Sequence, residues 1–305
     1  MALTLAELVS ILIDIIAPIM AVAAIGFALA RIFSLDSRVL SKLSLYLFSP
    51  ALIFVSIYRS KLGTEFVSIA AFAFIIFGLM GVVTWVLAKF LRFDRMTTSA
   101  FALSTMFVNA GNYGLPLGLF AFGQEGLSRA VVFFVATSIL AQTFAIFIAA
   151  RGTVTNRDAL FQVLKMPLIY AAALALVFNA YQWQIPEPVM KSVDLLSGGT
   201  IPLVLVILGI ELSRAALTQD RGVIALATFV RLVIAPLLAF GLAAAMGLQG
   251  VARSVCIVEA STPTAVLAAI IASEFKAKSD FVTGAVLVST LASVVTLTIL
   301  IGILR

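Results

Sequence analysis

The chain has 305 residues, of which 63% are hydrophobic and 11% are charged, and its mean hydropathy is +1.19. This composition excludes a soluble domain, which would need far more polar residues to cover its surface, and predicts a helical protein that crosses a lipid bilayer several times. The chain has no histidine and one cysteine, Cys256, which excludes an internal disulfide and a zinc site built on these residues. The net charge of +6 does not indicate nucleic-acid binding, because the basic residues are scattered between apolar segments.

Ten apolar segments are long enough to cross a bilayer, which takes about 20 residues. They cover residues 5–31, 39–58, 66–90, 98–123, 127–150, 166–183, 189–213, 222–246, 251–273 and 281–304. The connections between them are short, and the longest polar one lies near the midpoint of the chain. We therefore expect an all-α integral membrane protein with ten transmembrane helices.

Prolines recur at nearly constant spacing, which indicates that the second half of the chain repeats the first. The spacings are 149, 152 and 147 residues for the pairs Pro18 and Pro167, Pro50 and Pro202, and Pro116 and Pro263. Because each half has an odd number of spans, the second half enters the membrane from the opposite side, and the repeat is inverted. We expect a first five-helix repeat at 1–151, a cytoplasmic linker at 152–165 and a second repeat at 166–305.

The basic residues also predict the orientation of the chain. Thirteen Lys and Arg residues lie in the loops after odd-numbered spans, six lie on the other side, and one lies within a span. Basic loops stay on the cytoplasmic side of a membrane. We expect a multi-pass protein of the plasma membrane, the inner membrane in a bacterium, with both termini outside.

The fourth segment is interrupted in its middle, at residues 107–117. The interruption contains Asn109, Asn112, Tyr113, Gly114 and Pro116, where a lipid-facing helix would carry aliphatic residues. Proline removes a backbone donor and clashes with the preceding turn, and glycine loosens the chain further. Backbone groups freed in this way must be buried in protein or line a watery cavity. We interpret these five residues as part of a substrate-binding site at a break in the helix.

A second interruption lies in the ninth segment, at residues 258–265, and contains Ser261, Thr262 and Pro263. Interrupted segments at matching positions of two halves indicate the substrate site of a secondary transporter. The half-helix after each break presents free N–H groups and the positive end of its dipole, which suit an anion such as a carboxylate. The alternative is a pair of proline-kinked helices packed through small residues.

Charged and amide side chains lie within other segments. Glu259, in the ninth segment, could bind a cation, carry a coupling proton or pair with Arg231 in the eighth segment. Gln142, in the fifth segment, is a further candidate for substrate binding. It could instead hydrogen-bond between helices, as could the hydroxyls of the second break. Glu211 and Arg214 are expected to form an ion pair one turn apart.

The two interruptions carry a specific resemblance. Residues 109–117, Asn-Ala-Gly-Asn-Tyr-Gly-Leu-Pro-Leu, resemble the fourth-helix motif of bacterial members of the auxin efflux carrier family, and residues 258–266 resemble its ninth-helix motif. Segments 208–214 and 230–236 are also similar to parts of that family. Gly-Leu-Pro-Leu at 114–117 is similar to the Gly-Ile-Pro-Leu of plant PIN auxin exporters, whose long cytoplasmic loop this chain lacks. The bile acid:sodium symporters share the architecture more distantly.

The resemblance implies that spans 4 and 9 cross at their breaks. It implies a scaffold of spans 1, 2, 6 and 7 and a moving unit of spans 3–5 and 8–10. Asn109, Asn112 and Pro116 match the first crossover, and Glu259 and Pro263 match the second. Family members carry organic anions such as malate, malonate or auxin, and dimers among relatives allow a homodimer here.

We therefore expect an elevator-type secondary carrier of a small organic anion, a mono- or dicarboxylate, driven by an ion gradient or the membrane potential. The coupling ion would be Na⁺ or H⁺, and no other cofactor is expected. An anion channel is the first alternative. An integral-membrane enzyme is the second, although it would need a cluster of His, Cys or paired carboxylates in the membrane. The sequence leaves open the identity of the substrate and the direction of transport.

Overall fold

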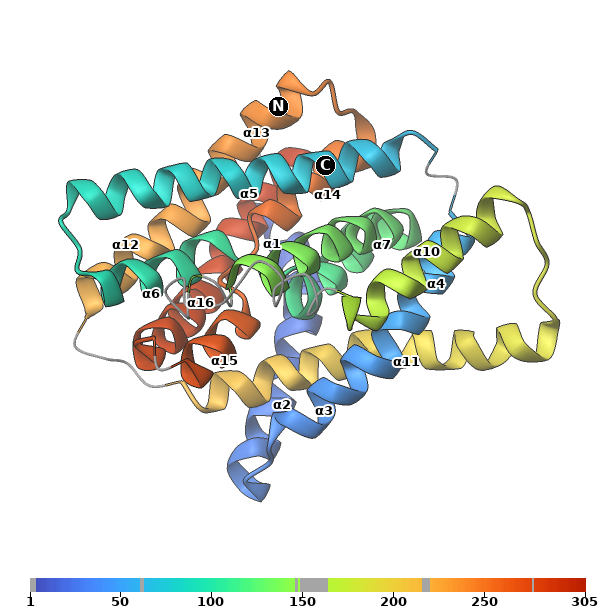
Figure 1. Cartoon of the computed structure of the whole chain (residues 1–305), viewed down its shortest axis with the longest axis horizontal. Coiled ribbons are helices and arrows are strands. Elements are labelled where there is room, and N and C mark those ends of the chain that lie inside the picture. The colour runs from blue at the N-terminus through green and yellow to red at the C-terminus, as the bar shows by residue number, and fades with distance from the viewer. Residues whose placement is uncertain (1–3, 61–62, 146–147, 149–163, 216–219, 276) are drawn as a thin grey trace.

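The computed structural model describes residues 4–60, 63–145, 148, 164–215, 220–275 and 277–305. These residues form helices joined by short connections, and their only β-type pairing is one isolated bridge. Helices α5 (Glu65–Phe90) and α11 (Glu187–Ser213) are long, and α7 (Leu115–Leu140), which is divided at Gly123, lies between them (Figure 1). The all-helical class predicted from the composition is confirmed for this part of the chain.

The remaining helices follow the apolar segments of the sequence. They are α1 (Leu5–Ile11), α2 (Ala17–Phe33), α3 (Ser37–Leu43), α4 (Ser49–Tyr58), α6 (Arg95–Met106), α10 (Pro167–Ala180), α12 (Arg221–Phe229), α13 (Ala235–Ala245), α14 (Gly250–Ala260), α15 (Val266–Glu274) and α16 (Ser279–Leu304). Short π-helical turns, η1 to η5, join several of them into longer rods.

Seven helical stretches of the described residues are long and apolar enough to cross a membrane. They are Leu5–Phe33, Ser37–Tyr58, Glu65–Phe90, Ala110–Ala145, Glu187–Ser213, Arg221–Ala245 and Ser279–Leu304. The stretch Ala110–Ala145 joins parts of two predicted spans and turns back on itself at Gly123, whose φ of 65° suits glycine, so that Gly118 packs against Ala130. The other predicted spans are divided at a break or, like α10, short. The count of ten spans and the inverted repeat remain predictions, and most of the predicted linker lies outside the described residues.

Four of the π-helical turns lie directly before a proline. They are η1 (Leu12–Ile16), η2 (Ser44–Phe48), η3 (Ala110–Gly114) and η5 (Val230–Ile234), and the helix that follows each has proline as its second residue: Pro18, Pro50, Pro116 and Pro236. Proline donates no hydrogen bond and its ring clashes with the carbonyl four residues earlier. The turn before it therefore widens, and a π-helical turn continues the rod without ending it.

Helices α2 and α11 approach each other closely enough for their backbones to touch. A Cβ atom on Gly26 would lie 2.9 Å from Val206 Cα, and one on Gly209 would lie 2.7 Å from Phe27 N. Backbone atoms on both sides leave no room for a side chain at either glycine. The two helices are therefore held as a rigid pair.

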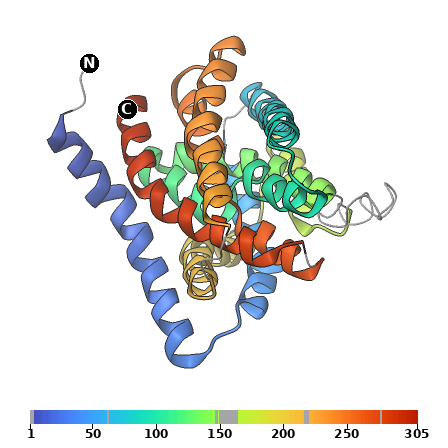
Figure 2. The ribbon, with the colours of Figure 1, turned by 90° about the vertical axis from the view of Figure 1, so that its left-hand side faces the viewer.

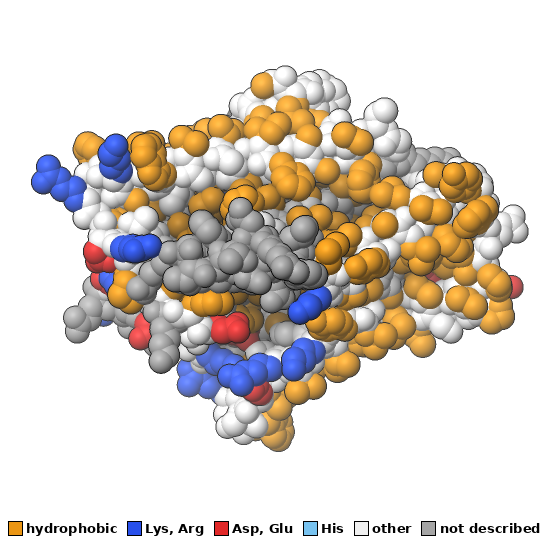
Figure 3. Space-filling model, in the orientation of Figure 1, with side chains coloured by type: hydrophobic (Ala, Val, Ile, Leu, Met, Phe, Trp, Pro, Cys, Tyr) orange, Lys and Arg blue, Asp and Glu red, His pale blue; other side chains and the backbone are white. Residues whose placement is uncertain are grey.

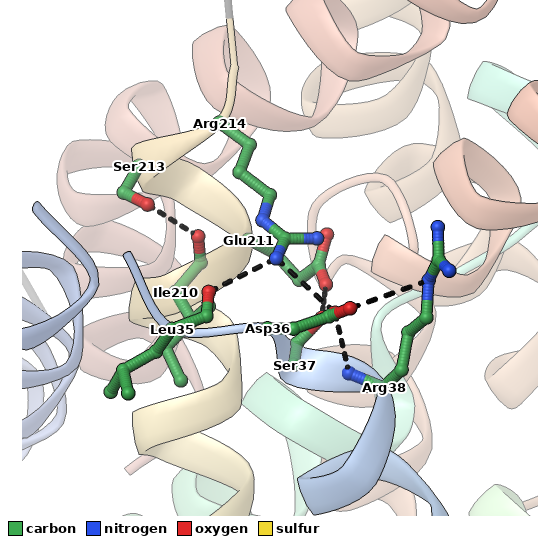
Figure 4. A network of polar contacts seen from close by, with 8 residues as sticks. All are labelled: Leu35, Asp36, Ser37, Arg38, Ile210, Glu211, Ser213 and Arg214. Atoms are coloured by element: carbon green, nitrogen blue, oxygen red, sulfur yellow. Dashed lines mark hydrogen bonds and ion pairs between the residues drawn. The ribbon is translucent and has the colours of Figure 1, made fainter. Parts of the chain in front are cut away.

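A polar network fastens the end of α11 to the loop between α2 and α3 (Figure 4). The Arg214 guanidinium donates to the Leu35 carbonyl at 3.0 Å and pairs with the Asp36 carboxylate at 3.2 Å. The Ser37 hydroxyl donates to Glu211. The expected pair between Glu211 and Arg214 is therefore wrong, because each side chain reaches across to the other segment.

The surface separates charged from apolar regions. Lys and Arg side chains gather on the left and lower left of the face in Figure 3, and hydrophobic side chains cover most of its upper and right parts. The left edge is where α5 ends and α6 begins (Figure 1). The start of α1 and the end of α16 lie at the same end of the molecule (Figure 2), and the two helices are in contact.

Candidate functional site

The two predicted breaks lie against each other and are joined backbone to backbone. The N–H of Asn109 donates to the Pro263 carbonyl at 2.9 Å, and the N–H of Ala265 donates to the Phe107 carbonyl at 2.9 Å. These bonds form the isolated antiparallel bridge of the fold. Each break thus satisfies polar backbone groups that the other exposes, which is what irregular backbone inside a membrane requires.

Four helix ends meet at this crossing. Helices α6 and α14 end there, at Met106 and Ala260, and the rod of η3 and α7 and helix α15 begin there, at Ala110 and Val266. Two negative and two positive dipole ends are therefore brought together at the two breaks.

A cavity of about 210 Å³ borders the crossing on one side. Residues 110–112, at the start of the η3 and α7 rod, and residues 265–268, at the start of α15, both line it. The first N–H groups of a helix have no partner within the helix. The cavity therefore lies beside two positive helix ends, an arrangement that suits an anion.

Three of the predicted binding residues, Asn109, Asn112 and Gln142, line this cavity. The Asn109 side chain is buried, and its amide nitrogen has no hydrogen-bond partner among the described residues. A buried donor without a partner is costly, so the free Asn109 amide is a group that a bound anion would satisfy.

Six other predicted binding residues do not line the cavity: Tyr113, Gly114, Pro116, Ser261, Thr262 and Pro263. The Tyr113 phenol turns away and accepts a hydrogen bond from Ser293 at 3.3 Å. The hydroxyls of Ser261 and Thr262 donate to carbonyls of the preceding turn, at 2.6 and 2.8 Å. These residues shape the crossing and do not face the cavity.

Arg231 bridges the ends of two half-helices. Its side chain is fully buried, with 1% of its surface exposed. It donates to the Thr105 carbonyl at 2.9 Å, to the Thr262 carbonyl at 3.0 Å and to the Ala260 carbonyl. These acceptors lie at the negative ends of α6 and α14, so the guanidinium charge offsets both dipoles. No ion pair between Arg231 and Glu259 is present among the described residues, although the sequence suggested one.

Glu259 is buried without a polar partner. Its side chain is 1% exposed, and neither carboxyl oxygen accepts a hydrogen bond from the described part of the chain. The carboxyl group packs against Gly114, where a Cβ atom would lie 2.5 Å from the carboxyl carbon. A bare carboxylate in such a place is too costly, so Glu259 must be protonated or beside a cation. Within the described residues no three His, Cys, Asp or Glu side chains gather as a metal site would need.

Comparison with known proteins gives the family. The sequence profile of the family described as "Membrane transport protein", which is the auxin efflux carrier family, matches residues 11–301. The chain belongs to this family. It is 28% identical over 265 residues to an uncharacterized transporter from Methanothermobacter thermautotrophicus, covering 86% of this chain and 87% of the relative. It is 22% identical over 289 residues to an uncharacterized transporter from Methanocaldococcus jannaschii, covering 91% and 94%. It is therefore a multi-pass membrane protein of a transporter family.

The far wall of the transporter's cavity comes from helices that sequence reasoning did not assign to the site. Ser41, Ser44 and Ser49 from α3, η2 and α4 line it, together with Met166 before α10 and Ile207 on α11. The sequence signal for this wall was a group of three serines spaced by roughly one helical turn, the last of which precedes a proline. Ser41 lies between two basic residues, and Met166 follows a lysine. The cavity therefore reaches toward the side of the membrane on which the basic loops lie.

A second cavity of the transporter, of about 860 Å³, lies toward the other ends of the same helices. Ion pairs border it: Arg59 with Asp194 at 2.7 Å, and Arg129 with Glu125 at 3.1 Å. The first pair joins α11 to the residue after α4, and the second lies within α7. Both cavities thus separate α7 and the crossing from α4 and α11.

Proposed function

We propose that the chain is a secondary active carrier of a small organic anion, a mono- or dicarboxylate. One observation carries this proposal: the two half-helices that begin at the crossing both border the cavity that Asn109, with its unpaired amide nitrogen, also lines. Two positive helix ends and an amide donor, facing a largely apolar wall, suit a carboxylate with a small organic body. The family membership supports transport and leaves the substrate open.

We further propose ten transmembrane helices in two inverted repeats, residues 1–151 and 166–305, in the plasma membrane with both termini outside. The scaffold would be spans 1, 2, 6 and 7, which include the rigid pair of α2 and α11. The moving unit would be spans 3–5 and 8–10, which carry the crossing. Cavities toward both ends of the boundary between these groups support a sliding, elevator-type motion.

Coupling to an ion gradient is assigned to Glu259. Its carboxyl group contacts Gly114, and the Gly114 N–H donates to the Asn109 carbonyl at 2.9 Å. Gain or loss of a proton or cation at Glu259 would therefore act on the backbone of Asn109, a residue that lines the cavity. Such a contact couples the two binding events, in the sense that each changes the affinity of the other.

The transport proposal is tested with purified protein and a panel of acids that includes malonate, L-malate and indole-3-acetate. A ligand that binds the native state raises the thermal midpoint. Acids that do so are then tested for counterflow in proteoliposomes, where a carrier exchanges labelled for unlabelled substrate. Single-channel currents without counterflow would identify an anion channel instead. No binding and no flux with any acid of the panel would contradict an organic-anion carrier.

The coupling role is tested with Glu259→Gln, which keeps the shape of the side chain and removes its charge. The variant should lose accumulation driven by a gradient and keep exchange, because exchange does not require release of the coupling ion. A Glu259→Gln variant that concentrates substrate with unchanged dependence on pH and Na⁺ would assign coupling to another group. Gln142→Glu is the variant for comparison. It adds a carboxylate to a residue that lines the cavity and leaves Glu259 in place, so it should impair anion binding and not the coupling.

A further inference from the structure

Three main-chain carbonyl oxygens accept hydrogen bonds from the Arg231 guanidinium, and Arg231 also lines the cavity. Its three acceptors are main-chain carbonyls, two of them from the second break and one from the last turn of α6. They come from segments more than 150 residues apart in the chain and converge on one buried group. In transporters with broken helices, carbonyls at the ends of half-helices are the groups that coordinate Na⁺.

The guanidinium satisfies these buried carbonyls as a bound cation would. It carries a positive charge, it is buried, and it donates separate N–H groups to the separate carbonyls. Its side chain comes from η5, a third element, so it ties α6 and α14 to the eighth span. The nearest buried carboxyl on these elements, Glu259, makes no bond to it.

We propose that Arg231 is a resident cation of the crossing, which occupies the carbonyl oxygens where a broken-helix carrier would otherwise hold Na⁺. The native chain then takes no Na⁺ at these carbonyls, and their charge stays compensated in every state of the protein. If the chain is the carrier proposed above, the Arg231 guanidinium keeps a positive charge at the crossing throughout the transport cycle.

Removal of the guanidinium should have a specific effect on the protein. Arg231→Gln leaves three buried carbonyls without a charged donor, and a small cation that enters the space can satisfy them. The variant should therefore be less stable than the native protein and should respond to Na⁺ more strongly than the native protein does. Arg231→Lys keeps a cation and should respond to Na⁺ no more than the native protein does.

The experiment measures the thermal midpoint of the purified full-length protein in NaCl and in choline chloride at equal ionic strength. Any rise of the native midpoint in NaCl should be lost in Glu259→Gln, because Na⁺ would then be bound at that carboxylate and not at the carbonyls. Saturating NaCl should raise the midpoint of Arg231→Gln by roughly 3 °C or more, as ligand binding to the native state does. Arg253→Gln, which removes an arginine that lies over the Phe240 ring, is the matched control and should show no Na⁺ dependence.

Two results would overturn the proposal. One is native protein that binds radioactive sodium stoichiometrically and keeps that binding in Glu259→Gln, since such sodium does not depend on the Glu259 carboxylate. The other is a folded Arg231→Gln variant whose midpoint responds to NaCl no more than that of Arg253→Gln. If Arg231→Gln does not fold, the decision falls to sodium binding by the native protein, where its absence supports the proposal. None of these measurements uses a transported substrate, so they stand apart from the test of transport.

Discussion

Replacement of Gly114 by alanine tests the contact between the coupling carboxyl and the first break. A Cβ atom at this position would lie 2.5 Å from the Glu259 carboxyl carbon and 2.6 Å from Oε1, whereas ordinary contacts begin near 3.4 Å. The carboxyl group must therefore move by about 1 Å within a packed interior. Overpacking of this kind costs about 1–3 kcal/mol.

The assay is the thermal midpoint of purified Gly114→Ala, which should fall by roughly 2–12 °C at about 2–4 °C per kcal/mol. Gly241→Ala is the control, since nothing lies within 4 Å of a Cβ atom on that helical glycine. In the double variant Gly114→Ala with Glu259→Ala the clash is absent. The two effects should therefore be non-additive by about 1–3 kcal/mol. Additive effects, or a Gly114→Ala variant as stable as Gly241→Ala, would refute the contact.

The other predictions concern the cavity, the orientation, the scaffold and a helix cap. Asn112→Leu should abolish counterflow and the thermal shift by acids with an unchanged midpoint, because Asn112 lines the cavity and Leu cannot hydrogen-bond an anion there. Cysteine at exposed Gln124 should react in intact cells with an impermeant thiol reagent, and cysteine at exposed Ser34 should not; the reverse pattern would invert the topology. Gly209→Ala should destabilise by about 3 kcal/mol, because the opposing backbone atoms cannot give way. Asp94→Ala should lower the midpoint at neutral pH, since the Thr97 N–H bonds this carboxylate and lowers its pKa; the difference from the native protein should vanish as the pH falls below 3.8 through that lowered pKa.

The sequence was informative where local chemistry determines the structure. A proline after a run of apolar residues must disturb the helix, and four such prolines follow a π-helical turn. The carboxamides and glycines around Pro116 marked a segment that could not face lipid, and the structure buries it against the second break. The burial of Glu259 was likewise predictable, because it lies in the middle of an apolar segment.

The sequence did not reveal which groups those segments would meet. Charge alone suggested that Arg231 pairs with Glu259, but backbone carbonyls, which every residue has, accept its hydrogen bonds. Tyr113 is adjacent to a cavity residue, yet its ring points to Ser293 on α16, a contact set by long-range packing. The serine-lined wall lies in a different segment from the breaks, and only the fold brings them together.

The pairing of the two breaks through main-chain atoms has a consequence for how this protein can change over evolution. The bonds from Asn109 to Pro263 and from Ala265 to Phe107 use only N–H and carbonyl groups, which every residue except proline can supply at the donor positions. Side chains around the cavity can therefore be replaced while the crossing keeps its geometry. A substitution in the cavity wall therefore changes other atoms than those that hold the two breaks together.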